Sequence, residues 1–355
     1  MQTDFSHQIG QLLMIGIGGT TLTREEKRFI CDEQIGGVIL FSRNVADPTQ
    51  CAKLTRHLRS LTETPMLIGI DQEGGRVSRL RPPFTLFPTA RRLGEYDRPE
   101  VTYQCAAAMA AELTAVGINL NFAPVLDIDT HPANPIIGDR AFGATPQQVI
   151  RHALPVISGL QDHGVMACGK HFPGHGDTST DSHHTLPICD LTPSRMEAVE
   201  LAPFAAAISA GIGCLMTAHV LYPQIDDCRP ASLSEVVVND LLRGRLGYDG
   251  VVITDDLEMK AITQGFSVAD AAVRSIAIGS DIALICHRFD LQQAALEALR
   301  QAVAVGKISK ERIDRSLDRI RRLKTRFRFD DRQTPDRIAT VVGCAAHQAC
   351  VAAVR

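Results

Sequence analysis

Features that would place a protein in a membrane or on nucleic acid are missing from this sequence. The first residues, Met1 to Phe5, form neither the basic segment nor the apolar core of an export signal, and no apolar run of about twenty residues occurs. The formal net charge is -3, and Lys and Arg are spread too thinly to form a phosphate-binding stripe. We therefore expect a cytoplasmic protein without a membrane or nucleic-acid partner, acting on a small, mostly uncharged substrate.

The ten cysteines include no CxxC pair and do not cluster. A small secreted domain held by disulfides would show a compact cysteine pattern, whereas a cysteine inside an apolar run behaves as a small hydrophobic residue. We expect reduced thiols at the scattered positions Cys31, Cys51, Cys105, Cys168, Cys214 and Cys286.

The chain has 355 residues, of which 45% are hydrophobic, so it can bury a large core. Short apolar runs recur along it, and near-continuous apolar strands are what a parallel sheet covered on both faces requires. The runs predict eight strands, at Leu12–Ile17, Gly37–Phe41, Met66–Ile70, Ile118–Ala123, Val165–Cys168, Cys214–Ala218, Val251–Thr254 and Ile282–Cys286.

Helical patterns separate these strands, and several begin at Pro, Ser or Thr and end at Gly. Eight alternations of strand and helix favour a single (β/α)8 barrel of the TIM type, an α/β fold, over residues 1–330. A doubly wound open sheet is the alternative, but Gly16 to Gly19 lacks the spacing of a dinucleotide-binding GxGxxG motif. The tail, residues 331–355, is either a helix packed on the barrel or the start of a linker. The predicted helices include Pro99–Val116, Pro146–His163, Pro193–Ala210 and Val268–Gly279.

Polar residues follow most of the predicted strands. In such a barrel the carboxyl ends of all strands meet at one opening, here called the mouth, where barrel enzymes carry their catalytic residues. Three connections after strands are also long, over residues 72–97, 127–145 and 171–192, and long loops in a compact domain are usually functional. We expect one site to be formed by Asp71-Gln72-Glu73, Pro124 to Asp127, Lys170-His171, His219, Asp255-Asp256 and His287.

The loop after the fifth predicted strand holds the densest group of ionisable residues, and in it Asp181 and His183 flank one serine. A carboxylate bonded to an imidazole fixes its tautomer and favours its protonated form, which suits an acid/base catalyst near neutral pH. The spacing alone is a weak signal, because an Asp in a turn also serves as a cap.

Asp255 and Asp256 end the seventh predicted strand. A carboxylate held at the carboxyl end of a barrel strand faces the mouth and can act as a nucleophile or stabilise a cation. Either residue could instead cap the following helix, which needs only one of them. We assign Asp255 to the site and Asp256 to the cap.

Residues after the third, fourth and fifth strands form a mixed set of charges. Asp accepts paired hydroxyls and Arg offers a fork of donors, so such a set can recognise a sugar with an amide or carboxylate substituent. Structural ion pairs across the mouth would look the same in the sequence. The set comprises Asp71, Arg76, Arg79, Asp139, Arg140, Lys170 and His171.

A metal site is the competing interpretation. Barrel metallohydrolases commonly begin with His-x-His on the first strand, whereas Met14-Ile15-Gly16 offers no ligand there. We therefore expect no metal and no cofactor, and we interpret His7, His175 and His184 as ordinary polar residues. The ligands available to the alternative are His171, His175, Asp177, Asp181, His183 and His184.

Five motifs, in order within residues 8 to 325, together resemble glycoside hydrolase family 3 and, within it, the β-N-acetylglucosaminidase branch. They are Gly69 to Val77 (GIDQEGGRV), Asn134 to Gly143 (NPIIGDRAFG), Lys170 to Gly176 (KHFPGHG), Asp181-Ser182-His183 and Thr254 to Met259 (TDDLEM).

The resemblance implies a retaining exo-enzyme in which Asp255 attacks the anomeric carbon. His183, oriented by Asp181, would protonate the leaving oxygen and later activate water. By the same comparison the terminal N-acetylglucosamine is held by Asp71, Arg79, Arg140, Lys170, His171 and His219.

The resemblance also implies a muropeptide substrate, N-acetylglucosamine on anhydro-N-acetylmuramic acid, in peptidoglycan recycling, and we expect a monomer. Some family members draw their acid from a second domain, for which this chain has no room. The tail from Val341 to His347 resembles the start of the linker to that domain, so we expect it to be a remnant.

Other functions stay open at this point. The enzyme could be a broader β-N-acetylhexosaminidase, or a phosphorylase, because a histidine acid/base repels phosphate less than a carboxylate would. A metal-dependent hydrolase is a further alternative. A sugar-binding barrel without turnover is disfavoured because both catalytic positions are intact.

Overall fold

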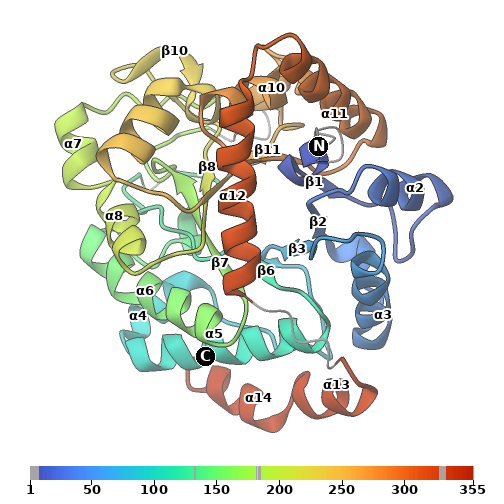
Figure 1. Cartoon of the computed structure of the whole chain (residues 1–355). Coiled ribbons are helices and arrows are strands. Elements are labelled where there is room, and N and C mark those ends of the chain that lie inside the picture. Colours follow the sequence, from blue (N-terminus) through green and yellow to red (C-terminus); the bar gives the residue numbers. More distant parts are fainter. Residues whose placement is uncertain (1–7, 132, 181, 183–184, 328–332, 355) are drawn as a thin grey trace.

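The centre of the molecule is a closed barrel of eight parallel strands, in the order β1-β12-β11-β8-β7-β6-β3-β2 (Figure 1). The computed structural model describes residues 8–131, 133–180, 182, 185–327 and 333–354. All eight predicted strands are confirmed, and the closed barrel rules out the open doubly wound sheet. The strands are β1 Leu13–Gly16, β2 Gly37–Leu40, β3 Leu67–Ile70, β6 Leu120–Asn121, β7 Met166–Phe172, β8 Cys214–Thr217, β11 Val251–Asp256 and β12 Ile282–Ile285.

The barrel closes between its first and last strands, where Leu13 pairs with Ala283 and Ile15 with Ile285. Nearly every residue of these strands is buried, as a parallel sheet covered by helices requires. Two hairpins lie in the loops at the mouth: β4 Gln72–Gly74 with β5 Val77–Ser78, and β9 Leu221–Tyr222 with β10 Asp226–Pro230.

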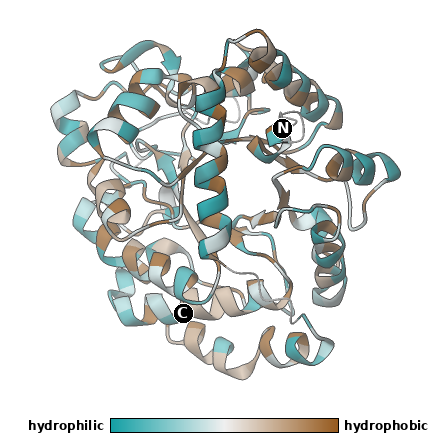
Figure 2. Cartoon of the chain, viewed as in Figure 1, coloured by the Kyte–Doolittle hydropathy of each residue, from teal (hydrophilic) through white to brown (hydrophobic). Residues whose placement is uncertain are grey.

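Helices surround the barrel, and several of them, such as α12, carry both hydrophilic and hydrophobic residues (Figure 2). The expected start and stop signals are present. The Thr145 side chain caps α6 and precedes Pro146, while Ser267 caps α10, which ends at Gly279 with a φ of 130°. The helices are α2 Arg24–Asp32, α3 Pro48–Arg59, α4 Ala90–Tyr96, α5 Pro99–Ala115, α6 Pro146–Asp162, α7 Pro193–Ala198, α8 Ala202–Ser209, α9 Lys260–Thr263, α10 Val268–Ile278, α11 Phe289–Ala304, α12 Lys310–Arg326, α13 Pro335–Val341 and α14 Ala345–Ala352.

One predicted helix, over 193–210, is in fact two helices, α7 and α8. Pro203 lies in the first turn of α8 and has no N–H to donate to the carbonyl of Val199, four residues earlier, so an unbroken helix would lose that bond. Val199 leaves the helical region, with φ -122° and ψ -74°.

The described part of the tail forms α13 and α14, which both pack against α5 (Figure 1). Glu112 of α5, 2% exposed, accepts hydrogen bonds from the Gly343 amide (2.9 Å) and from Nδ1 of His347 (2.9 Å). The same carboxylate accepts from the amide and hydroxyl of Thr85. A buried carboxylate with four donors fixes the tail to the barrel wall.

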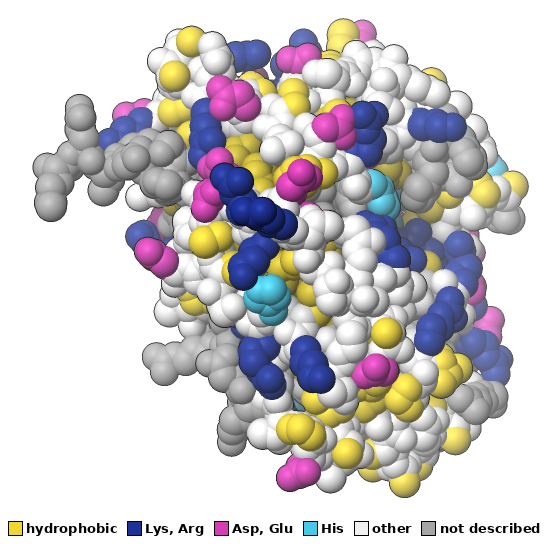
Figure 3. Space-filling model, turned by 90° about the vertical axis from the view of Figure 1, so that its right-hand side faces the viewer, with side chains coloured by type: hydrophobic (Ala, Val, Ile, Leu, Met, Phe, Trp, Pro, Cys, Tyr) yellow, Lys and Arg dark blue, Asp and Glu magenta, His cyan; other side chains and the backbone are white. Residues whose placement is uncertain are grey.

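Among the described residues, no helix combines the length and the apolar character needed to span a bilayer. On the face that carries α2 and α3, basic and acidic side chains are mingled with apolar ones (Figure 3).

Candidate active site

Side chains from most barrel strands line a cavity of about 370 Å³ at the mouth. Most of the polar strand exits converge here as predicted, but Gln72, Asp127 and His219 do not line the cavity. Two of the strands run further than expected, so Lys170 and His171 lie within β7, and Asp255 and Asp256 end β11, rather than following these strands. The lining includes Phe41, Asp71, Glu73, Arg76, Arg79, Arg140, Lys170, His171, His175, Ser182, Asp255, Asp256 and His287.

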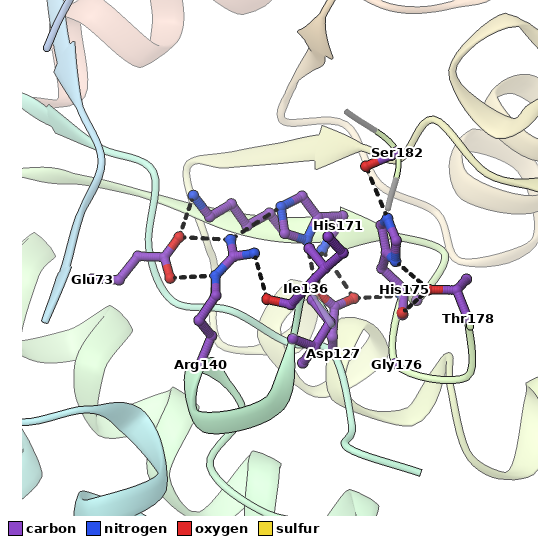
Figure 4. Close-up of polar contacts among 12 residues, drawn as sticks. Glu73, Asp127, Ile136, Arg140, His171, His175, Gly176, Thr178 and Ser182 are labelled. Atoms are coloured by element: carbon purple, nitrogen blue, oxygen red, sulfur yellow. Dashed lines mark hydrogen bonds and ion pairs between the residues drawn. The ribbon is translucent and has the colours of Figure 1, made fainter. Parts of the chain in front are cut away.

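Four charged side chains, those of Asp71, Glu73, Arg140 and Lys170, form a buried cluster at the cavity. Nζ of Lys170 lies 2.8 Å from Oδ1 of Asp71 and 2.7 Å from Oε1 of Glu73. Arg140 donates to both oxygens of Glu73, at 2.8 Å each (Figure 4). Two carboxylates and two cations compensate one another here, which is what makes burying them tolerable.

These contacts fix the charge of each partner. Burial disfavours the charged form of Lys170, but the carboxylates of Asp71 and Glu73 outweigh it and raise the pKa of the ammonium. Burial acts likewise on Asp71, and Lys170 and Arg79 outweigh it and lower the pKa of that carboxyl. Asp71 and Lys170 are therefore charged at neutral pH.

Two arginines lie nearer the rim. Arg79 is 3.2 Å from Oδ2 of Asp71, and its guanidinium lies 5.4 Å from the centre of the Phe41 ring. Arg76 pairs with Asp139 at 2.8 Å, and the exposed fraction is 49% for the Arg76 side chain and 41% for that of Asp139. The loop pair of Arg76 and Asp139 is thus one of the structural ion pairs that the sequence left open.

His171 is oriented by the carboxylate of Asp127, which was predicted as a strand exit without an assigned role. Its Nδ1 lies 2.7 Å from Oδ2 of Asp127, a residue with 0% exposure. Burial opposes the ionisation of Asp127, but His171 and the hydrogen bond from the His175 amide outweigh it and lower the pKa of the carboxyl, so Asp127 accepts and Nδ1 is the donor. The other ring nitrogen, Nε2, lies 3.5 Å from Arg140.

Asp255 lines the cavity, and its Oδ1 accepts the Asp256 amide at 2.8 Å. Burial opposes its ionisation, but His219 and His171 outweigh burial and lower the pKa of the carboxyl. Asp255 is therefore a carboxylate at neutral pH, as a nucleophile must be.

Asp256 caps a turn rather than the helix α9, whose N-cap is Met259. Its Oδ1 accepts from the amides of Glu258 (3.1 Å) and Cys286 (3.2 Å). The prediction that Asp256 caps the following helix is therefore wrong, and Asp256 lines the cavity together with Asp255.

His219, predicted to contact the sugar, is only 1% exposed, and both of its ring nitrogens bond to the protein. Nε2 lies 2.9 Å from the carbonyl of Asp256 and so donates, and Nδ1 lies 2.7 Å from the hydroxyl of Ser232. His219 is not among the residues that line the cavity, and its bond to the Asp256 carbonyl supports the end of β11.

The predicted acid/base pair, Asp181 and His183, lies outside the described residues, as does His184. Ser182, between the two, is described: it lines the cavity, and its hydroxyl lies 3.3 Å from Nε2 of His175.

Among the described residues, one group at the mouth could reach a metal ion: Asp256, Glu258 and His287, whose ligand atoms lie within 4.8 Å of one another. Both carboxylates already accept backbone amides, Glu258 from His287 and Arg288, and Asp256 as given above. Strand β1 contributes no ligand, as the sequence indicated.

Glu73 and Asp127 were predicted only as polar strand exits, and their roles as partners of Arg140, Lys170 and His171 were not. Glu73 is two positions after Asp71 in an extended segment, and side chains two apart point to the same side, so this spacing could have found it. The role of Asp127, which follows β6, could not be predicted because its hydrogen-bond partners His171 and His175 lie 44 and 48 residues further along the chain.

Comparison with known proteins agrees with this geometry. Residues 5–323 match the model of the glycosyl hydrolase family 3 N terminal domain. A protein named beta-hexosaminidase from Thiobacillus denitrificans is 41% identical over 293 residues, which cover 81% of each chain.

Two solved structures are similar over nearly the whole chain. A family 3 beta-N-acetylglucosaminidase from Paenibacillus sp. has a TM-score of 0.90 at 43% identity, over 96% of this chain and 68% of that one. NagZ from Neisseria gonorrhoeae, solved with N-trifluoroacetyl-D-glucosamine, has a TM-score of 0.83 at 34% identity, over 97% and 96% of the two chains.

Proposed function

This chain belongs to glycosyl hydrolase family 3, and from this membership we propose that it is a retaining exo-β-N-acetylglucosaminidase that removes terminal N-acetylglucosamine from muropeptides. Homologues named as β-hexosaminidases support the enzyme class. The observation that carries the proposal is that one cavity joins the Asp255 carboxylate to the compensated charges of Asp71, Glu73, Arg140 and Lys170.

The buried charges suit recognition of one sugar. Asp71 accepts hydrogen bonds and Lys170 donates them, and both are held by partners on other elements of the barrel. A cavity of about 370 Å³ is of the size that holds one small ligand. A sugar that lacks the groups these residues pair with would leave them unsatisfied in a buried site, which disfavours its binding.

The rim suits an anionic aglycone. Arg140 is bonded to both oxygens of Glu73, and Lys170 to two carboxylates, so neither offers unbalanced charge to a peptide carboxylate. Arg76 and Arg79 are also paired, with Asp139 and Asp71, but their side chains are 49% and 32% exposed at the rim, so a carboxylate of the aglycone can reach them. This supports a muropeptide over an uncharged oligosaccharide.

The chemistry proceeds in two steps. Asp255 attacks the anomeric carbon as the bond to the aglycone oxygen breaks, and His183, oriented by Asp181, gives its proton to that oxygen. In the second step His183 takes a proton from water, and the water oxygen displaces Asp255 from the anomeric carbon. The assignment of His183 and Asp181 rests on the family motif.

The proposal is tested with a chromogenic β-N-acetylglucosaminide and the matching β-glucoside. We expect kcat/KM to be at least about a hundredfold higher for the N-acetylglucosaminide, because the site is built for the acetamido group. Muropeptides with a terminal N-acetylglucosamine should be cleaved to free sugar, with the Asp255→Asn variant as the control for contaminating activity.

Two further arms separate the alternatives. Added phosphate should leave the product as N-acetylglucosamine, whereas formation of the sugar 1-phosphate would indicate a phosphorylase. EDTA should leave turnover unchanged, whereas loss restored by zinc would indicate a metallohydrolase. A preference for the glucoside would refute the substrate assignment and leave the family membership.

A further inference from the structure

His175, in the segment that follows β7, was interpreted from the sequence as an ordinary polar residue. In the structure it is 2% exposed, and both ring nitrogens face hydroxyl groups. Nδ1 lies 2.8 Å from Oγ1 of Thr178, and Nε2 lies 3.3 Å from Oγ of Ser182 (Figure 4).

The hydrogen bonds around Thr178 determine which nitrogen carries the proton. The Thr178 hydroxyl donates its one hydrogen to the carbonyl of His175 at 3.0 Å. With its hydrogen on that carbonyl, Oγ1 accepts from the ring, and this network assigns the ring proton to Nδ1. Nε2 is left with a lone pair, so Ser182 is the donor in the remaining bond.

The imidazole is neutral at physiological pH. Burial, followed by the charge of His171, lowers the pKa of His175 to about 4. The lone pair on Nε2 is thus available to Ser182 over the whole range in which a neutral-pH enzyme works.

The backbone of His175 is held to neighbouring segments by hydrogen bonds that do not involve Ser182. The His175 amide donates to Oδ1 of Asp127 at 2.6 Å, and the side-chain amide of Asn134 donates to the carbonyls of His175 (2.9 Å) and Gly176 (3.0 Å). A Cβ at Gly176 would collide with the carbonyl of Ile128, so the two segments are in close contact.

The same anchor serves the sugar-binding side of the cavity. Asp127 also orients His171, and the rings of His171 and His175 meet edge to face with centroids 5.8 Å apart. His175 therefore lies between a residue predicted to hold the sugar and the serine at the centre of the Asp181-Ser182-His183 motif.

We propose that His175 is a positioning residue for the acid/base step, because its imidazole accepts the Ser182 hydroxyl and fixes the point in the chain between Asp181 and His183. The inference rests on the proposed function, in which those two residues transfer the proton. His175 acts through Ser182 and exchanges no proton with the substrate.

The test compares two kinds of N-acetylglucosaminide, one with an activated aryl leaving group and one with a poor leaving group, such as chitobiose. General acid catalysis contributes about a hundredfold or more where the leaving oxygen needs a proton. We expect His175→Ala and Ser182→Ala to lower kcat on chitobiose by about tenfold or more and on the aryl glycoside by less than about threefold. Inhibition by N-acetylglucosamine should change by less than about twofold, because the sugar contacts remain.

The chain offers a matched control in His152 of α6. It is 1% exposed, its Nδ1 lies 2.9 Å from the hydroxyl of Thr102, and its ring stacks on Phe142. His152→Ala removes a buried histidine with a similar hydroxyl bond, and it should leave the ratio of the two kcat values unchanged.

A double-mutant cycle gives the decisive result. If His175 acts through Ser182, the double variant should be no slower on chitobiose than His175→Ala alone. Additive losses, or equal losses on both substrates, would overturn the inference. If His175→Ala does not fold, Ser182→Ala alone still tests the inference, because it should lower kcat on chitobiose far more than kcat on the aryl glycoside. A wild-type protein that cleaves neither substrate would instead refute the proposed function.

Discussion

Two buried lysines mark the opposite ends of the barrel. Lys170 lies at the mouth and is 2% exposed, and Lys324 of α12 is 5% exposed and lies at the amino-terminal ends of β1 and β2. The partners of Lys170 are the carboxylates of Asp71 and Glu73, whereas Nζ of Lys324 donates to neutral oxygens, Oε1 of Gln11 (2.7 Å) and the carbonyl of Gly36 (3.1 Å).

The partners give the two lysines opposite properties. At the mouth the carboxylates outweigh burial, and the pKa of Lys170 rises. At the other end nothing offsets burial, which lowers the pKa of Lys324 to about 7. A cavity lies beside each lysine, of about 370 Å³ at the mouth and about 610 Å³ beside Lys324. Compensated charges opposite a nucleophile, rather than cavity size, therefore distinguish the active site.

The largest expected effect comes from removing the nucleophile at the mouth. Asp255→Asn should lower kcat at least about a thousandfold, because the amide cannot form the covalent intermediate. The free energy of unfolding should change little, and N-acetylglucosamine should still bind, as measured by urea denaturation and calorimetry. Near-wild-type turnover would move the nucleophile to Asp256 or refute the two-step mechanism.

Much of the architecture behind this prediction could be deduced from the sequence. The barrel strands are continuous apolar runs, so their number and order could be predicted, and the polar residues at their carboxyl ends gave the mouth. The break between α7 and α8 was missed although Pro203 signals it, because the apolar pattern continues across the break.

Pairings across the barrel could not be deduced. The sequence gives no sign that Arg140 bonds to Glu73, 67 residues away, or that Asp127 joins His171 to His175. Two findings follow only from these long-range contacts. Arg140 and Lys170 are cations compensated by buried carboxylates, and His175 is anchored beside Ser182.

Replacing each lysine by methionine tests the comparison directly. Lys170→Met should lower kcat/KM about a hundredfold and destabilise the fold by about 3 kcal/mol, because Asp71 and Glu73 lose the buried cation that they share and each keeps only one arginine. Lys324→Met removes no contact at the mouth, so its kcat/KM should stay within about twofold of wild type. Similar losses of activity in both variants would show that the two ends are not functionally distinct.

The last effect concerns the stability of the fold and not turnover, and it is specific to the end of the barrel that carries Lys324: it is the pH dependence of stability. Between pH 7 and the ordinary lysine pKa of 10.5, the unfolded chain keeps a proton on Lys324 that the folded chain has released. Because the unfolded state then binds more protons, this group makes the folded state more stable as pH rises, by at most about 1.4 kcal/mol per pH unit. Below pH 7 Lys324 is protonated in both the folded and the unfolded state, and the folded state is then destabilised by the full free energy of burying the ammonium.

Lys324→Met removes this titration. The unsatisfied oxygens of Gln11 and Gly36 that it leaves behind do not titrate, so they shift the stability of the variant equally at every pH. The free energy of unfolding of the variant minus that of the wild type should therefore be greatest below pH 7 and fall between pH 7 and pH 10, in urea titrations at several pH values. Lys307→Met, at an exposed position, should show no such trend. A constant difference for Lys324→Met would mean that the ammonium stays charged, and that neutral oxygens stabilise a buried lysine as well as the carboxylates at the mouth do.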